Sequence, residues 1–208
     1  GYSDYYPELP GGNALGRALE PELFDGKALG PDLALLRPPV IPIPAGLTFT
    51  AGEYKRLGLV MRTWQGKRTA LRIGLRLVGA WLTGRKMLMM GQALIGRLRL
   101  SLKKRDIPLW LDTPLQDLLV DGGRVTGVRV EREGQPLDLV VRKGVILAAG
   151  CFAHNLEMRL KYQKHPISTD WTVASEGNTG DGILAGQRAG AAVDLMDEAW
   201  WGPSSLPP

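Results

Sequence analysis

The sequence predicts an α/β protein, because helical and strand-like patterns occupy separate stretches of the chain. Apolar residues recur at helical spacing between residues 53 and 105. Short apolar runs separated by glycine-containing turns follow between 107 and 149. A last stretch, 176–193, joins a glycine-rich turn to a small-residue helical pattern. Helices, a meander of strands and a helix opened by glycine together favour this class.

Composition places the chain among globular proteins. Of its 208 residues, 44% are hydrophobic and 23% are charged. The single cysteine, Cys151, excludes an internal disulfide and fits a reducing compartment, so we expect a cytoplasmic protein. The chain shows no signal peptide and no uninterrupted apolar run long enough to span a bilayer. It starts without Met and ends on "SSLPP", which leads us to expect a segment of a longer protein.

Charge is distributed unevenly along the chain. Residues 54–105 contain fourteen Lys or Arg and no Asp or Glu, which leaves 12 of the 26 basic residues elsewhere beside all 21 acidic ones. Such a block predicts either charge pairing within the protein or a surface for anionic partners. Two histidines and one cysteine are too few for a metal site, and none is expected.

Residues 1–52 are rich in Pro and Gly and should form extended connections. Three helices are expected between 53 and 105, with breaks at Gly66 and Gly84. We expect their apolar faces to pack on the protein and their charges to be solvated; contact with an anionic membrane is the less favoured alternative. The apolar faces contain Tyr54, Leu57, Met61 and Trp64, then Leu71, Leu75, Val78 and Leu82, then Leu94, Leu98 and Leu102.

Residues 107–149 are expected to form strands. The candidates are "IPLWL", "PLQDLLV", "VTGVRVER" and "LDLVVR", with turns at "DGGR" and "EGQP". The continuous apolar run in "GVILAAG" is typical of a strand that is buried on both faces.

The stretch 176–193, "EGNTGDGILAGQRAGAAV", has two interpretations. The first is a capped loop followed by a helix that packs closely through small residues. In the second, a helix that starts at Asp181 or Gly182 points its free N–H groups at a bound ligand, and glycine lets that ligand approach the backbone.

Four motifs in order resemble the flavoproteins of the fumarate reductase type. They are "ALIGRLRLSLKKRDIPLWLDTPLQDLLVDGGRVTGVRVEREG", "GVILAAGCFAHN", the 176–193 stretch and "MDEAWW". Within these flavoproteins the chain looks most like the 3-ketosteroid 1-dehydrogenases, and the opening "YSDYYPELPGG" supports that narrower match. The resemblance covers nearly the whole chain and is least secure at 53–90.

The resemblance implies part of an FAD-binding, Rossmann-like domain over residues 1–200, with a β-meander and a helical insert at about 53–90. Residues 201–208 would begin a substrate domain. FAD is the implied cofactor. The implied cofactor-binding residues are Leu115, whose backbone would meet the adenine, Ala148, Gly150, Asn178, Thr179, Gly180, Asp181 and Gly182.

The implied activity is the dehydrogenation of a 3-oxosteroid or a similar small apolar ketone next to its carbonyl. A hydride would pass to the flavin and a proton to a tyrosine base outside this segment. Tyr5 resembles the tyrosine that hydrogen-bonds to this base, and an ordinary surface tyrosine is the other interpretation. No nucleic-acid partner is expected. The alternatives are a fumarate- or succinate-type flavoenzyme and a non-catalytic module that binds membranes or anions.

Two departures from the family pattern stand out. The family usually has Thr-Gly-Gly where this chain has Ala149-Gly150-Cys151, and we expect Cys151 to be a small buried residue in a glycine's place. The Gly-rich turn G-x-G-x-x-G, which would hold the diphosphate of the cofactor, does not occur in the 208 residues.

Overall fold

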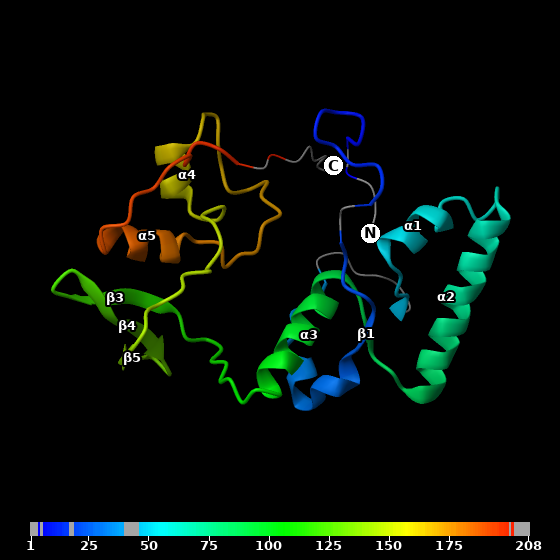
Figure 1. Ribbon diagram of the computed structural model, residues 1–208, viewed down its shortest axis with the longest axis horizontal. Coiled ribbons are helices and arrows are strands. Elements are labelled where there is room, and N and C mark those ends of the chain that lie inside the picture. Colours follow the sequence, from blue (N-terminus) through cyan, green and yellow to red (C-terminus); the bar gives the residue numbers. More distant parts are fainter. Residues whose placement is uncertain (1–3, 5, 17–18, 40–45, 200, 202–208) are drawn as a thin grey trace. The chain divides into compact units, whose positions relative to one another are not determined.

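The computed structural model describes residue 4 and residues 6–16, 19–39, 46–199 and 201. The chain divides into two compact units, Gly1–Leu109 and Trp110–Pro208, whose elements are labelled in Figure 1. Tyr5 lies outside the described residues. The helices and antiparallel strands agree with the predicted α/β class.

The first unit is mainly helical. In chain order it contains β1 (Phe24–Asp25), the 3-10 helix η1 (Gly26–Leu35), α1 (Ala51–Leu57), α2 (Trp64–Thr83), β2 (Met87–Leu88) and α3 (Met90–Lys103). The short strands β1 and β2 pair antiparallel. Its core forms where α3 crosses β1 and η1, around the buried side chains of Phe24, Leu29 and Ala93. Gly96 of α3 completes this contact, since a Cβ there would lie 3.0 Å from the Phe24 ring.

The breaks between the predicted helices are partly as expected. Gly84 ends α2 in the left-handed conformation, with a φ of 61°, as predicted. The break predicted at Gly66 is wrong, because Gly66 lies in the first turn of α2 and donates its N–H to the N-cap Thr63. A glycine stands there because a Cβ would lie 2.6 Å from the carbonyl oxygen of Leu59 in the preceding turn.

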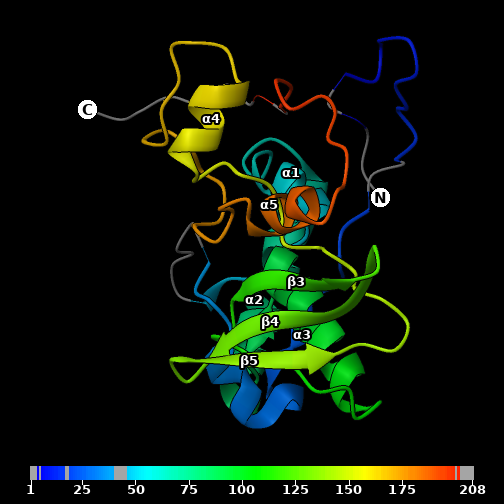
Figure 2. The same ribbon diagram turned by 90° about the vertical axis from the view of Figure 1, so that its left-hand side faces the viewer.

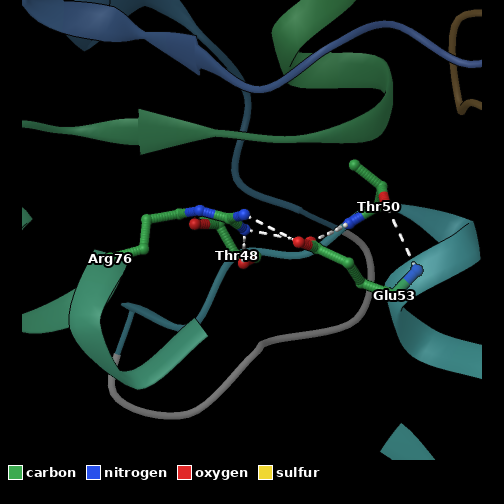
Figure 3. A network of polar contacts seen from close by, with 4 residues as sticks. All are labelled: Thr48, Thr50, Glu53 and Arg76. Carbon is green, nitrogen blue, oxygen red and sulfur yellow. Dashed lines mark hydrogen bonds and ion pairs between the residues drawn. The ribbon is translucent and has the colours of Figure 1, made fainter. Parts of the chain in front are cut away.

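A partly buried ion pair joins α1 to α2 (Figure 3). The Arg76 guanidinium donates to both carboxylate oxygens of Glu53, at 2.7 and 3.0 Å, and also to the Thr48 carbonyl. Glu53 additionally completes the capping box of α1 with Thr50. The hydrogen bond from Arg76 lowers the pKa of Glu53 below its ordinary 4.5, against the opposing effect of burial.

The apolar face of α2 is exposed, which contradicts the expectation that it packs on the protein. The exposed fractions are 64% for Leu71, 65% for Leu75, 53% for Val78 and 71% for Leu82. The opposite side of the helix is buried through Gly66, Thr69 and Ile73. Contact with α1 through these smaller residues, together with the Glu53–Arg76 pair, accounts for this orientation. None of the helices in the described part of the chain is long and apolar enough to cross a membrane.

The second unit contains a three-stranded antiparallel sheet and two short helices. The strands are β3 (Leu115–Asp121), β4 (Arg124–Arg132) and β5 (Gln135–Val140), with β4 in the middle, as Figure 2 shows. Both predicted turns are confirmed, with glycines in the left-handed conformation at 122–123 and 134. The helices are α4 (Leu156–Tyr162) and α5 (Asp181–Arg188), and α5 was predicted from the 176–193 stretch.

Two predicted strands are absent from the described residues. The "IPLWL" and "GVILAAG" segments, at 107–111 and 144–150, form neither helix nor strand and pair with no described strand. The second is also not buried, since Ile146 is 94% exposed. An apolar run becomes a strand only when a neighbour accepts and donates its backbone hydrogen bonds, and composition does not show whether that neighbour is present.

The Glu53–Arg76 pair yields a stability prediction. Arg76→Met should lower the free energy of unfolding by about 2 kcal/mol, because it leaves a buried carboxylate without its charged donor. Chemical denaturation measures the effect. Lys67→Met removes the same charge from an exposed position of the same helix and should change stability by less than about 0.5 kcal/mol. Equal effects of the two substitutions would contradict a structural role for the pair.

The same pair predicts a dependence on pH. Because the folded pKa of Glu53 is lowered, its stabilising contribution is complete above pH 4.5 and is lost as the pH falls through the lowered value. The difference in unfolding free energy between the wild type and Arg76→Met should therefore be constant above pH 4.5 and should narrow as the pH falls below 4.5. A difference that stays constant as the pH falls below 4.5 would show that Glu53 is not the titrating partner.

Candidate functional site

The loop before α5 is fixed by hydrogen bonds to the segment that leads into α4. Gly180 donates its N–H to the Cys151 carbonyl at 3.1 Å, and His154 donates its N–H to the Asn178 carbonyl at 2.9 Å. Asn155 donates from its side chain to the Thr179 carbonyl at 2.8 Å. Residues 178–180 and 151–155 therefore form one hydrogen-bonded assembly in the second unit.

Asn155 is a residue of this assembly that the sequence analysis missed. Its side-chain oxygen accepts from the Met158 N–H and caps α4, while its amide nitrogen reaches the Thr179 carbonyl. The sequence held a signal for the first role, because asparagine directly before the helical run "LEMRLKY" is a typical N-cap. The second role joins residues 24 positions apart, and no local pattern indicates it.

The buried glycines of the loop pack against the protein itself. Gly180 has a φ of 82° and is the N-cap of α5. A Cβ at Gly180 would lie 2.5 Å from the Met158 sulfur, and one at Gly182 would lie 3.2 Å from the Cβ of Ala149. The close-packed helix, the first of the two interpretations of this stretch, therefore accounts for both glycines. The expectation that they leave room for a ligand is not needed to explain them.

Asp181 and Thr179 lie at the front of α5. Asp181 is exposed in the first turn, and its carboxylate accepts a hydrogen bond of 2.7 Å from the Thr179 hydroxyl. No side chain caps the start of this helix. As at any helix start, its first backbone N–H groups have no partner within the helix. The polar groups available here are therefore these amides and the Asp181 carboxylate, which Thr179 orients.

The segment 148–150 runs beside this helix start. Ala148, Ala149 and Gly150 are exposed, and Gly150 has a φ of 84°. A Cβ at Gly150 would collide with the side-chain oxygen of Asn178, which places these two residues in contact. Cys151 is exposed as well, so the expectation that it is buried is wrong. The Cys151 carbonyl accepts the hydrogen bond from Gly180, and the exposed Cys151 thiol does not fill a space in the packing.

Leu115 lies away from the loop. Its neighbour Asp117 forms an ion pair of 3.1 Å with Arg188, the last residue of α5, and Arg188 also donates to the Gln116 carbonyl. The hydrogen bond from the Leu118 N–H, followed by that from Arg188, lowers the pKa of Asp117. The loop precedes the first residue of α5, so Leu115 and the loop are associated with opposite ends of a helix about 12 Å long.

The predicted residues thus fall into three groups. The structure brings together Gly150, Asn178, Thr179, Gly180, Asp181 and Gly182, with Ala148 in the adjoining exposed segment. It places Leu115 on β3, and Tyr5 lies outside the described residues. Within the described part of the chain, no group of three His, Cys, Asp or Glu residues is arranged to hold a metal ion.

Comparison with known proteins gives a clear family match. Residues 29–208 match the model of the FAD binding domain family, and the chain belongs to that family. The expected α/β class and the expected cofactor, FAD, are confirmed by this match. The site is compatible with such a group in one physical respect: the start of α5 has no side-chain cap, and the exposed Ala and Gly residues of 148–150 border it.

Individual relatives agree with the narrower resemblance. The chain is 46% identical over 98% of its length to a 3-oxosteroid 1-dehydrogenase of Mycobacterium tuberculosis, and 35% identical over 89% to one of Comamonas testosteroni. It spans 37% and 34% of those proteins. A crystal structure of the 3-ketosteroid Δ1-dehydrogenase of Sterolibacterium denitrificans, in complex with 1,4-androstadiene-3,17-dione, matches all of the chain and 39% of its own, with a TM-score of 0.83 and 37% identity.

The packing of the loop predicts how glycine substitutions act. Gly180→Ala should lower the free energy of unfolding by about 3 kcal/mol, the sum of left-handed strain and a clash with Met158. Gly134→Ala, in a left-handed turn with open space around the Cβ position, should cost only the strain, about 1 kcal/mol. Chemical denaturation of both variants separates the two causes. Similar losses for both would mean that packing at Gly180 is unimportant.

Proposed function

We propose that this protein is an FAD-dependent dehydrogenase that acts on a 3-ketosteroid-like substrate next to its carbonyl. The observation that carries the proposal is the 46% identity to a 3-oxosteroid 1-dehydrogenase along nearly the whole chain. The fold adds support, since the solved structure that it matches over its full length is a steroid-bound dehydrogenase. An apolar ketone is therefore the proposed substrate class, and a cytoplasmic location fits the single free cysteine.

The chain's own residues would hold the cofactor at the start of α5. Asn178, Thr179 and Asp181 would make polar contacts with FAD, and the exposed backbone at Ala148 and Gly150 would border it. Leu115, at the far end of α5, would offer its backbone to a different part of the same large molecule. Gly180 and Gly182 would act indirectly, because they set the position of the helix start.

The chemistry divides between the cofactor and the protein. Bound FAD would supply the acceptor for the electrons removed from the substrate. The role that we assign to the side chains of this chain is orientation. The Thr179 hydroxyl donates to the Asp181 carboxylate, and the Asn155 side chain donates to the Thr179 carbonyl. Tyr5 is proposed to support the catalytic base through a hydrogen bond.

In domain terms, residues 1–200 would contribute to the FAD-binding domain, with the helical insert at about 53–90, and 201–208 would lead into the substrate domain. This division follows function, whereas the compact units at 1–109 and 110–208 follow packing.

The activity test uses a purified protein of the relatives' full length that contains this chain, with a 3-ketosteroid and an artificial electron acceptor. We expect acceptor reduction that depends on the steroid, together with the absorbance bands of bound flavin. Reduction of fumarate without steroid oxidation would instead support the fumarate-type alternative. Flavin bands without either activity would support neither enzyme assignment.

Asp181 provides a sharper test of the cofactor assignment. Asp181→Ala should weaken FAD binding about tenfold, equivalent to about 1.4 kcal/mol, because a carboxylate accepts hydrogen bonds from sugar hydroxyls. Stability of the apoprotein should change by less than about 0.5 kcal/mol, since the side chain is exposed. FAD titration and denaturation of the apoprotein measure the two quantities, both in a protein of the relatives' full length that contains this chain.

Asp170→Ala is the matched control. Asp170 is also exposed and also accepts a hydrogen bond from a hydroxyl two residues earlier, that of Ser168 at 2.8 Å. Its removal should leave FAD affinity unchanged. If the two variants bind FAD equally well, Asp181 does not contact the cofactor.

The 208-residue chain by itself should bind FAD weakly or not at all. The reason is that its sequence contains no G-x-G-x-x-G turn, whose amides and helix start would bind the diphosphate. Titration of FAD into the isolated chain, followed by flavin fluorescence, measures this. Tight stoichiometric binding would show that the α5 helix start and the 148–150 segment are sufficient.

A further inference from the structure

Arg159 of α4 is a buried charge that has no opposite charge beside it. Two ionised side chains are buried in the described part of the chain, Glu53 at 7% and Arg159 at 8% exposure. Glu53 has the Arg76 guanidinium as its partner, whereas no described carboxylate forms an ion pair with Arg159. Burial of an ion costs free energy that only its hydrogen bonds can offset here. The partners of those hydrogen bonds therefore indicate what the buried charge does.

The Arg159 guanidinium joins the end of α4 to the segment before its start. Its Nε donates a hydrogen bond of 3.0 Å to the side-chain oxygen of Gln163, the C-cap residue of the helix. Its Nη1 donates a hydrogen bond of 3.2 Å to the carbonyl of Ala153, two residues before the N-cap Asn155. A guanidinium presents its donors in fixed directions, so one rigid group holds both partners. Since α4 has only seven residues, contacts of this kind must keep it in place.

Ala153 lies where the backbone pairing between two segments is irregular. Backbone hydrogen bonds join Cys151 to Gly180 and His154 to Asn178. Three residue steps on the first segment therefore face two on the second. The first segment thus has an extra residue, as in a β-bulge, and the backbone groups of the extra part need partners outside the pairing. The guanidinium supplies that partner for the Ala153 carbonyl.

The irregular segment determines where α5 begins. The N-cap of α5, Gly180, donates its N–H to the Cys151 carbonyl. The residue before it, Thr179, accepts from the Asn155 side chain and donates from its own hydroxyl to the Asp181 carboxylate. A shift of the irregular segment would therefore move the start of α5, and the Asp181 carboxylate with it.

We propose that Arg159 is a positioning residue for FAD binding. It acts through the Ala153 carbonyl: with the guanidinium in place, the pairing keeps its extra residue and the start of α5 keeps its orientation. Arg159 itself makes no contact with FAD in this proposal. The inference rests on the proposed role of the α5 start in cofactor binding, and it adds a buried residue of α4 that sets the geometry of that start.

The first test measures amide hydrogen exchange in the apoprotein, using a protein of the relatives' full length that contains this chain. Arg159→Gln removes the charge and leaves a side chain that is too short to reach both partners. We expect the protection of the Gly180 and His154 N–H groups to fall about tenfold relative to the amides of β4, because local opening no longer has to break the charged hydrogen bond. An equal fall at β4 would indicate only a loss of global stability and would overturn the proposal.

The second test measures the FAD affinity of the folded protein in a double-mutant cycle. Arg159→Gln should weaken FAD binding about tenfold. In that variant Asp181→Ala should cost much less affinity than it costs in the wild type, because the carboxylate is no longer held in its binding orientation. The matched control, Arg76→Gln, also removes a partly buried guanidinium that joins two segments, but in the first unit, and should leave FAD affinity unchanged. Additive effects of the Arg159 and Asp181 substitutions would overturn the proposal.

Arg159→Lys separates the effect of position from that of charge. Lysine keeps the positive charge but lacks the fixed pair of donor directions. We expect it to restore FAD affinity only as far as it restores the protection of the Gly180 amide. Full affinity with low protection would show that the charge attracts the cofactor directly, and it would overturn the positioning role. If Asp181→Ala alone leaves FAD binding unchanged, the cofactor assignment of the α5 start fails, whereas unchanged protection in Arg159→Gln would contradict the role of Arg159 alone.

Discussion

The hydrogen bond from the Gly180 N–H to the Cys151 carbonyl is the constraint on which the candidate site depends. The position of Gly180 suits glycine alone, because its backbone is in the left-handed region and a Cβ there would clash with the Met158 sulfur. Once the hydrogen bond is made, the start of α5 is fixed beside the segment 148–150, and Asn155 adds a second attachment through Thr179. The polar groups at this helix start are therefore positioned by packing that is internal to the second unit.

This origin changes how the glycine-rich stretch should be understood. Its sequence suggests a ligand that approaches bare backbone, but the two buried glycines contact Met158 and Ala149. A ligand-binding loop needs rigid positioning as much as it needs space, and close packing behind the helix start supplies that rigidity. The residues that face outward are Asp181 and the exposed strip at 148–150, so specificity for a cofactor would lie with them and not with Gly180 or Gly182.

Local patterns predicted the elements whose determinants are local. The turns around residues 122 and 134, the end of α2 at Gly84 and the start of α5 each follow from residues within one turn of the chain. The segment 144–150 was mispredicted as a strand because strand formation depends on a distant neighbour. Family membership came from motif order, a signal that no single motif carries. The contact of Asn178 with Gly150 depends on the fold of the second unit, since 28 positions separate the two residues.

The reversed orientation of α2 has the same cause. Helical periodicity identifies which residues share a sector, and it correctly grouped Leu71, Leu75, Val78 and Leu82. It does not say which sector faces the protein, because that depends on what the neighbouring helix offers. In this unit α1 offers Glu53, and the strong hydrogen bonds between Arg76 and that carboxylate draw the polar side of α2 inward. This charged contact across two helices, together with the burial of Gly66, Thr69 and Ile73, leaves the apolar sector of α2 exposed.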